Sequence, residues 1–165
     1  MNIIMTGSTS FVGAATVREL LRRGHTVTAI VRPKSSKLDT ILEGNEEALL
    51  SGRLLVTEND LSEPEKLLEK VTKPQDVFCH FGWGGSGSAS RTDKALQEKN
   101  MEISLETIRT AKALGCKKFL FSGSQAEYGM HQDLITENTV CEPKSLYGEA
   151  KLAMREKGEK LCDEL

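Results

Sequence analysis

Residues 2–13 read NIIMTGSTSFVG, and the fold of the chain is read outward from them. The first four are a short apolar strand, a turn of small residues follows, and a helical pattern runs from Ala14 to Arg23. A turn of this kind brings backbone N–H groups and the positive end of the helix dipole to a pyrophosphate, and Gly13 lets the helix pack closely. The stretch predicts a dinucleotide-binding unit, with an ordinary β–α turn as the alternative.

Ser10 stands where dinucleotide folds usually have another glycine. Serine is the smallest side chain after Gly and Ala, so the close approach of a ligand is weakened but not excluded. The hydroxyl can itself bond a phosphate. Gly24 and His25 end the helix, as a C-terminal glycine does, and residues 26–31 read as a second strand.

Strands alternate with helices along the rest of the chain, which predicts an α/β fold with a doubly wound parallel sheet. We expect strands at 2–5, 26–31, 54–57, 76–81 and 117–122, and helices at 12–23, 63–70, 93–114 and 145–162. Residues 34–52 indicate a helix interrupted by Gly44 and Asn45. The last strand is expected to be an apolar sheet edge that can pair with another chain.

Tyr147 and Lys151 are four residues apart just after Pro143, a spacing that puts both side chains on one helix face. A tyrosine titrates at about 10, so a proton shuttle near neutrality needs its pKa lowered by roughly 3 units, about 4 kcal/mol. A fixed ammonium beside the phenolate can do this. The alternative is an exposed amphipathic helix that carries both residues by chance.

Residues 119–129, FLFSGSQAEYG, deliver small hydroxyl residues at the carboxyl end of a strand. In an open parallel sheet that end is where ligands bind. Ser124 would lie beside Tyr147 and hold a substrate oxygen in line with the phenol. A turn-forming serine is the alternative, and we favour the first interpretation because Tyr147 and Lys151 follow at a fitting distance.

In these features the chain resembles a known family, the extended short-chain dehydrogenases/reductases, over all 165 residues. The family comprises nucleotide-sugar epimerases, dehydratases and reductases. Six places carry the resemblance in order: residues 6–13, Asp60 with Leu61, residues 76–83, Asn100, residues 122–124 with Tyr128 and Gly129, and residues 147–151. The resemblance implies that Ser124 polarises the reacting oxygen, Tyr147 is the general acid/base, and Lys151 lowers its pKa and holds the nicotinamide ribose. Asn100 would support this network from its helix.

The resemblance also implies a nicotinamide dinucleotide as cofactor. The expected cofactor-binding residues are Gly7, Ser8, Thr9, Ser10, Phe11, Val12, Gly13, Arg32, Asp60, Leu61, Phe81, Gly82, Trp83, Asn100, Tyr147 and Lys151. Asp60 is expected to accept a hydrogen bond from the adenine amino group, and a helix N-cap is the competing role.

The choice between NADP and NAD depends on the residues after the second strand. No carboxylate stands there before Asp39, whereas Arg32, with Lys34 or Lys37, offers a fork for a 2′-phosphate. We therefore expect NADP to be preferred over NAD. The alternative is a solvated basic turn.

Residues 82–90, GWGGSGSAS, depart from the family's usual small-residue pair after the histidine. Their glycines permit unusual dihedral angles, so this loop is either a lid or a plain Gly/Ser connector. Trp83, the one tryptophan of the chain, is placed either to cover the cofactor or the sugar, or simply to pack.

The composition fits a cytoplasmic α/β domain spanning residues 1–165. A net charge of −2 gives no reason to expect nucleic acid or a membrane surface. The cysteines lack metal-ligand spacing, which indicates reduced structural thiols and no metal, and neither a signal peptide nor a membrane-spanning run is recognisable.

The expected function is NAD(P)-dependent oxidation, reduction or epimerisation at a hydroxyl or keto carbon of a nucleotide-linked sugar. The family's dehydratases have an acidic pair where this chain has Gln125 and Ala126, and Glu127 comes one place late, which favours epimerase or reductase. The family also has a small C-terminal substrate domain that we expect to be absent here, so the 165-residue chain alone is expected to be inactive. A dinucleotide-binding module or remnant without turnover is the alternative function, and a homodimer is one assembly that the chain allows.

Overall fold

The computed structural model describes residues 1–85 and 87–165. The chain divides into two compact units. The first unit comprises Met1–Gly82 and Glu106–Phe121, and the second comprises Trp83–Leu105 and Ser122–Leu165. Ser86, in the predicted Gly/Ser loop, lies outside the described residues.

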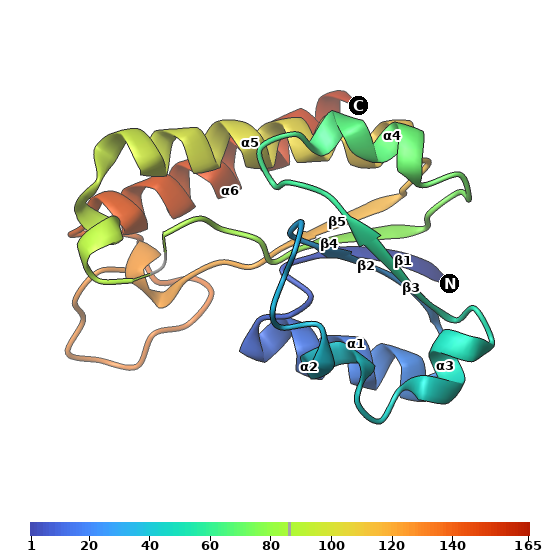
Figure 1. Ribbon diagram of the computed structural model, residues 1–165. Coiled ribbons are helices and arrows are strands. Elements are labelled where there is room, and N and C mark those ends of the chain that lie inside the picture. The colour runs from blue at the N-terminus through green and yellow to red at the C-terminus, as the bar shows by residue number, and fades with distance from the viewer. Residues whose placement is uncertain (86) are drawn as a thin grey trace. The chain divides into compact units, whose positions relative to one another are not determined.

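The first unit is built on a five-stranded sheet in the order β3-β2-β1-β4-β5 (Figure 1). Its strands are β1 (Asn2–Thr6), β2 (Thr26–Val31), β3 (Leu54–Glu58), β4 (Val77–His80) and β5 (Lys118–Phe121). Every neighbouring pair is parallel, and the strand order reverses beside β1. The doubly wound parallel sheet expected from the sequence is therefore confirmed.

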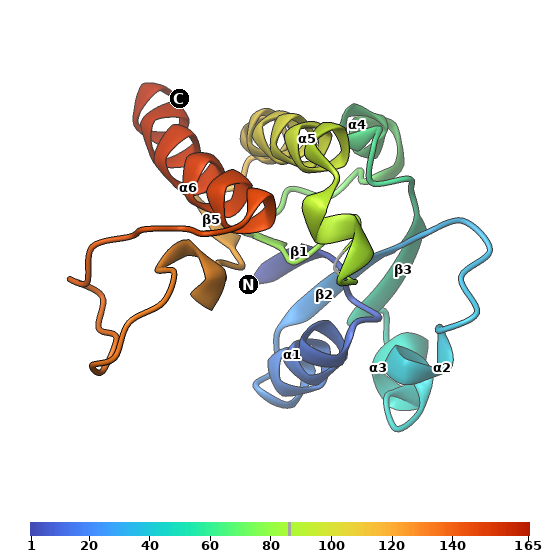
Figure 2. The same cartoon turned by 90° about the vertical axis from the view of Figure 1, so that its left-hand side faces the viewer.

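Helices cover both faces of this sheet. They are α1 (Phe11–Arg22), α2 (Asp39–Leu42), α3 (Glu46–Leu50), the 3₁₀ turn η1 (Pro64–Lys66), α4 (Leu67–Lys70) and the C-terminal part of α5 (Lys94–Ala113). Because successive strand residues point to opposite faces, Ile3 and Met5 pack with α1, α2 and α3, whereas Ile4 packs with α4 and α5. Figure 2 shows α1 and α4 on opposite faces of the sheet.

Local sequence signals explain where these helices end. Gly24 has a φ of 79°, and its N–H and that of His25 donate to the carbonyls of Leu21 and Leu20, which ends α1 as expected. Gly44, at φ 76°, separates α2 from α3, so the interrupted helix is confirmed. The helix expected at 63–70 is shorter: its first turn is the 3₁₀ turn η1, with Pro64 at its start.

β5 is an edge of the sheet. Among the described strands it pairs with β4 alone. Its residues alternate between exposed and half-buried, and Leu120 is 52% exposed. The predicted apolar edge is therefore present.

The second unit contains the loop after β4 and the longest helix segments. Its elements are the 3₁₀ turn η2 (Ala89–Thr92), the N-terminal part of α5, the 3₁₀ turn η3 (Gln125–Glu127) and α6 (Leu146–Glu164). Ser145 caps α6, since its hydroxyl accepts from the N–H of Gly148 at 3.1 Å. No helix within the described residues is long and apolar enough to cross a membrane.

Candidate functional site

The turn after β1 depends on two glycines. Gly7 has a φ of 70°, and a Cβ there would lie 2.6 Å from the carbonyl carbon of Phe81. A Cβ on Gly13 would collide with the carbonyl oxygen of Gly7. The start of α1 can therefore pack on the turn only because both positions lack side chains, which confirms the close packing expected of Gly13.

The two serines of this turn are held by the protein. Ser8 is buried, and its hydroxyl lies 2.8 Å from the carbonyl oxygen of Met5 and 2.9 Å from that of Ile30, so it fastens the turn to β1 and β2. Ser10 caps α1 by accepting from the N–H of Gly13 at 3.0 Å. A hydroxyl that accepts keeps its own proton to donate, so this bond is compatible with a phosphate contact at Ser10.

The turn and the start of α1 fit the phosphates of a dinucleotide. The helix has 12 residues, and its first N–H groups have no partner within the helix. Two apolar side chains at this end face solvent: Phe11 is 93% exposed and Val12 is 59% exposed. The donors, the missing side chains and the exposed apolar surface together match what a nucleotide cofactor requires.

A pocket of about 430 Å³ opens beside this turn. It is lined by Thr9, Ser10, Phe11, Ala14, Arg18, Asp39, Thr40 and Glu43. The first carboxylate after β2, Asp39, thus faces this space, whereas Arg32 does not line it. Arg32, Lys34 and Lys37 are exposed, and none has an ion-pair partner within the part of the chain that the structure describes.

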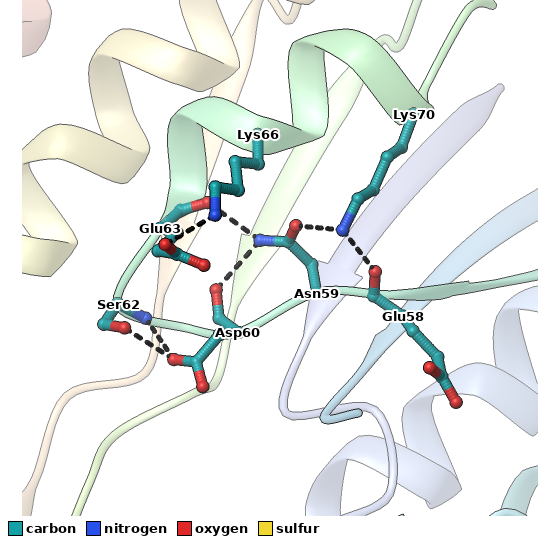
Figure 3. Close-up of polar contacts among 7 residues, drawn as sticks. All are labelled: Glu58, Asn59, Asp60, Ser62, Glu63, Lys66 and Lys70. Atoms are coloured by element: carbon teal, nitrogen blue, oxygen red, sulfur yellow. Dashed lines mark hydrogen bonds and ion pairs between the residues drawn. The ribbon is translucent and has the colours of Figure 1, made fainter. Parts of the chain in front are cut away.

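Asp60 lies in a polar network after β3 (Figure 3). Its Oδ1 accepts from the backbone N–H of Ser62 at 2.9 Å and from the hydroxyl of Ser62 at 2.7 Å. The residue in the N-cap position of η1 is Glu63, so Asp60 closes a turn and is not a helix N-cap. Its contact with adenine stays a prediction.

Asn59, next to Asp60, also holds the segment after β3 by hydrogen bonds. The amide of Asn59 donates to the carbonyls of Asp60 and Glu63, at 2.8 and 2.9 Å, and Lys70 donates to Asn59 Oδ1 at 2.8 Å (Figure 3). Leu61 reaches the end of β4, where a Cβ on Gly82 would lie 2.8 Å from its Cδ1. Two residues expected in the cofactor site, Leu61 and Gly82, are thus in close proximity.

The carboxyl ends of β1 and β4 are joined by polar contacts. Thr6 Oγ1 lies 2.8 Å from Nδ1 of the buried His80, and the N–H of Gly82 donates to Thr6 Oγ1 at 3.3 Å. The strand order reverses between these two strands. In an open α/β sheet such a reversal is where ligands bind.

In the second unit, Lys151 is buried at the base of the predicted reaction centre. It is 2% exposed, and its Nζ donates to the carbonyl of Ser122 at 2.9 Å. The same nitrogen lies 4.0 Å from the centroid of the Trp83 ring and 5.9 Å from that of Tyr147. Burial lowers the pKa of Lys151 to about 8, and the charge of Glu127 acts in the opposite direction.

Ser124 lies in a segment that packs on α6 at Gly148. It caps η3, with its hydroxyl accepting from the N–H of Ala126 at 3.2 Å. A Cβ on Gly148 would collide with the carbonyl oxygen of Ala126, so the helix turn that carries Tyr147 packs directly on this segment. The structure therefore places Ser124, Tyr147 and Lys151 in one neighbourhood of the second unit.

Trp83 packs inside this group. Its ring meets that of Tyr147 edge-on at 6.2 Å, and its Nε1 donates to Gln97 Oε1 at 2.9 Å. Asn100 holds the adjacent backbone: its side chain donates to the carbonyl of Gly84 at 2.8 Å and accepts from the Gly84 N–H at 3.0 Å. Asn100 thus acts on the Trp83 loop.

Sequence reasoning missed three side chains around this group. The guanidinium of Arg91 lies 4.9 Å from the centroid of the Tyr147 ring, and Gln97, which is buried, binds Trp83. No motif marks either of them. Glu127 is the third: in the sequence it reads only as an acid that comes one place late, and the capping-box spacing Ser124-x-x-Glu127 is the signal that could have revealed its role.

Within residues 1–85 and 87–165, no group of three or more His, Cys, Asp or Glu side chains is arranged to hold a metal ion. The four cysteines are unpaired thiols, and burial raises the pKa of Cys79.

Nearly the whole chain matches the model of one known protein family. Residues 3–164 match the model of the NAD dependent epimerase/dehydratase family. The chain belongs to this family. The match confirms the resemblance to nucleotide-sugar epimerases and dehydratases that the motifs predicted.

The chain is also similar to individual proteins and to solved structures. The chain is 30% identical to dTDP-6-deoxy-L-talose 4-dehydrogenase (NAD(+)) of Aggregatibacter actinomycetemcomitans, covering 94% of this chain and 53% of that protein. It is 29% identical to D-erythronate dehydrogenase of Cupriavidus necator, covering 92% and 47%. A crystal structure of UDP-glucose 4-epimerase superposes with a TM-score of 0.82 at 25% identity, covering 99% of this chain and 48% of that one. The chain thus spans about half the length of the proteins it matches.

Proposed function

We propose that the chain is the NAD(P)-binding part of a cytoplasmic enzyme that oxidises, reduces or epimerises a hydroxyl or keto carbon of a nucleotide-linked sugar. The observation that carries the proposal is the grouping of Ser124 and Tyr147 around the buried ammonium of Lys151. Relatives that act on dTDP- and UDP-linked sugars support the substrate class. The lack of acids at Gln125 and Ala126 favours epimerase or reductase over dehydratase.

In this proposal each residue has a separate role. Tyr147 gives a proton to the reacting oxygen, or takes one from it, and Ser124 donates a hydrogen bond to the same oxygen. Lys151 keeps a positive charge beside the phenol, which favours the phenolate. When bound, the nicotinamide supplies the hydride exchange.

Each unit contains residues that we propose for cofactor binding. The first unit would bind the pyrophosphate with residues 7–13 and the adenosine with Asp60 and Leu61. The second would supply Lys151 for the nicotinamide ribose. NADP is the proposed preference, because Arg32 and the neighbouring lysines are exposed and available for a 2′-phosphate.

The proposal is tested by cofactor binding and by turnover, measured separately. Titration of the 165-residue chain with NADPH and NADH, followed by nicotinamide fluorescence, should reveal binding. Turnover of UDP- and dTDP-sugars should be assayed in this chain and in any longer product of its gene, where Tyr147→Phe must abolish it. Cofactor binding without turnover in every form would favour the alternative, a dinucleotide-binding module.

We also propose that the chain self-associates through β5, as a homodimer or a larger assembly. The support is the open sheet edge that carries Leu120, since unpaired strand edges readily pair with another chain. Light scattering should detect the assembly, and Leu120→Lys should weaken it. A monodisperse monomer at all protein concentrations would contradict the idea.

A further inference from the structure

Glu127 is a buried carboxylate that the three proposed catalytic residues leave unexplained. The residue is only 2% exposed, although an ionised carboxylate at such depth is strongly disfavoured unless it is compensated. Its Oε1 accepts the N–H of Ser124 at 2.6 Å, and its Oε2 lies 3.6 Å from Nε of Arg155. These contacts supply the compensation that a buried carboxylate needs.

The contacts of Glu127 fix the strand end that carries Ser124. The hydroxyl of Ser124 accepts from Ala126 while its N–H donates to Glu127, so the segment is clamped from both sides as a capping box. A Cβ on Gly123 would be 3.0 Å from Oε1 of Glu127, which places the carboxylate directly against the backbone. The hydroxyl of Ser124 then keeps its one proton for another acceptor.

The same carboxylate acts on Lys151. Burial lowers the pKa of Lys151 to about 8, and Glu127 is the charged group that opposes this change. The other ionisable groups nearby are Tyr147 on the same helix, Arg91 over the Tyr147 ring, and Arg155, which shares Glu127. Of the charged groups named here, Glu127 is the one whose charge raises the pKa of Lys151 and so favours the ammonium.

We propose that Glu127 is a positioning residue of the reaction centre, whose charge holds the Ser124 backbone in place and maintains the ammonium of Lys151. The proposal rests on the function proposed above. The competing role is a plain cap of the three-residue turn η3. A cap needs an acceptor oxygen, whereas the positioning role needs the negative charge.

Substitutions at Glu127 separate the two roles. Glu127→Gln keeps an acceptor oxygen for Ser124 but loses the charge, and Glu127→Asp keeps the charge. The readout is the titration midpoint of Lys151, followed by NMR of the chain labelled with ¹³C-lysine and assigned with Lys151→Arg. Glu149→Gln, an exposed position on α6, is the matched control.

We expect Glu127→Gln to lower the midpoint of Lys151 by about one pH unit. We expect Glu127→Asp and Glu149→Gln to leave the midpoint near that of the wild type. A midpoint that Glu127→Gln leaves unchanged would overturn the proposal, as would an equal drop in Glu149→Gln. If Glu127→Gln does not fold by circular dichroism, Glu127→Ala takes its place, and a midpoint that Glu127→Ala leaves unchanged would overturn the proposal.

Turnover distinguishes this proposal from the function on which it rests. In any form that turns over, Glu127→Gln should lower kcat by about tenfold or more, with the KM for cofactor nearly unchanged, and Glu127→Asp should restore part of it. A lowered midpoint, with no turnover in this chain or in any longer product of its gene, would support the role of the charge and contradict the proposed function. An unchanged midpoint in an active enzyme would contradict the role of the charge and support the proposed function.

Discussion

The turn after β1 and the start of α6 both carry residues of the proposed site, but they are built by opposite means. At Gly7 and Gly13 the first unit omits side chains, so that backbone groups can approach each other and a ligand. In the second unit, Lys151 and Glu127 are charged side chains buried almost completely. A site made of backbone has no group that titrates near neutrality, whereas a site made of buried charges must respond to pH.

The largest effect is expected at Tyr147. Tyr147→Phe removes the proton shuttle and leaves the packing against Trp83, so turnover should fall by about 10²–10⁴-fold while dinucleotide affinity stays within about twofold. Steady-state kinetics of any form that turns over, beside cofactor titration, measures both. A rate within tenfold of the wild type, about 1.4 kcal/mol, would refute the acid/base role.

The buried ammonium should make stability depend on pH. Since burial lowers the pKa of Lys151 from 10.5 to about 8, the unfolded chain binds more protons between these values, and the free energy of unfolding rises there by about 3 kcal/mol. Below about pH 8 the full cost of burying the charge is present. Denaturation followed by circular dichroism should find that Lys151→Met loses this rise. Lys160→Met, an exposed position on the same helix, should keep it.

A side chain added at Gly13, in the turn after β1, should destabilise the first unit. Gly13→Ala places a Cβ against the carbonyl oxygen of Gly7, which should cost about 2 kcal/mol and weaken dinucleotide binding equally at pH 6 and pH 9. Gly87→Ala is the control, because a Cβ there meets nothing within 4 Å. A loss of binding at only one of the two pH values would break the contrast between the units.

The smallest effect concerns cofactor choice. Arg32→Ala should weaken NADPH by about tenfold and leave NADH nearly unchanged, because the guanidinium would contact only the 2′-phosphate. Asp39→Asn is the informative counterpart, since Asp39 lines the pocket beside residues 7–13. Tighter binding of NADH than of NADPH, or a larger effect of Asp39→Asn on NADH, would show that the carboxylate decides.

Much of the fold follows from local patterns. The strands and the helices α1, α5 and α6 appear where apolar periodicity predicted them. The break at Gly44 was predictable because glycine readily adopts the positive φ that it has there. The segment at 63–70 and the 3₁₀ turns η2 and η3 were harder, because three or four residues carry no periodicity. Pro64 indicates where η1 begins, but nothing in the sequence indicates where this turn ends.

The part of the candidate site that depends on spacing along one helix was predictable. Tyr147 and Lys151 share a face because they are one helical turn apart, and the serine before them follows a strand end. The inward hydroxyl of Ser8 and the paired bonds of Asn100 with Gly84 were not predictable, because they depend on how distant segments close on each other. Arg91 shares this property, since its place over Tyr147 depends on the path of the loop.

The contact between Trp83 and Lys151 gives the chain an optical probe beside the residues proposed for catalysis. Trp83 is the one tryptophan in the sequence, and its ring lies 4.0 Å from an ammonium and edge-on to Tyr147. Indole emission responds to nearby charge and to exposure to water, so light absorbed at the red edge of the protein band reports on this contact and on no other tryptophan. The emission spectrum therefore reports on the surroundings of Trp83 in the second unit, whereas circular dichroism reports on the secondary structure of the whole chain, so unfolding followed by the two signals compares the second unit with the rest.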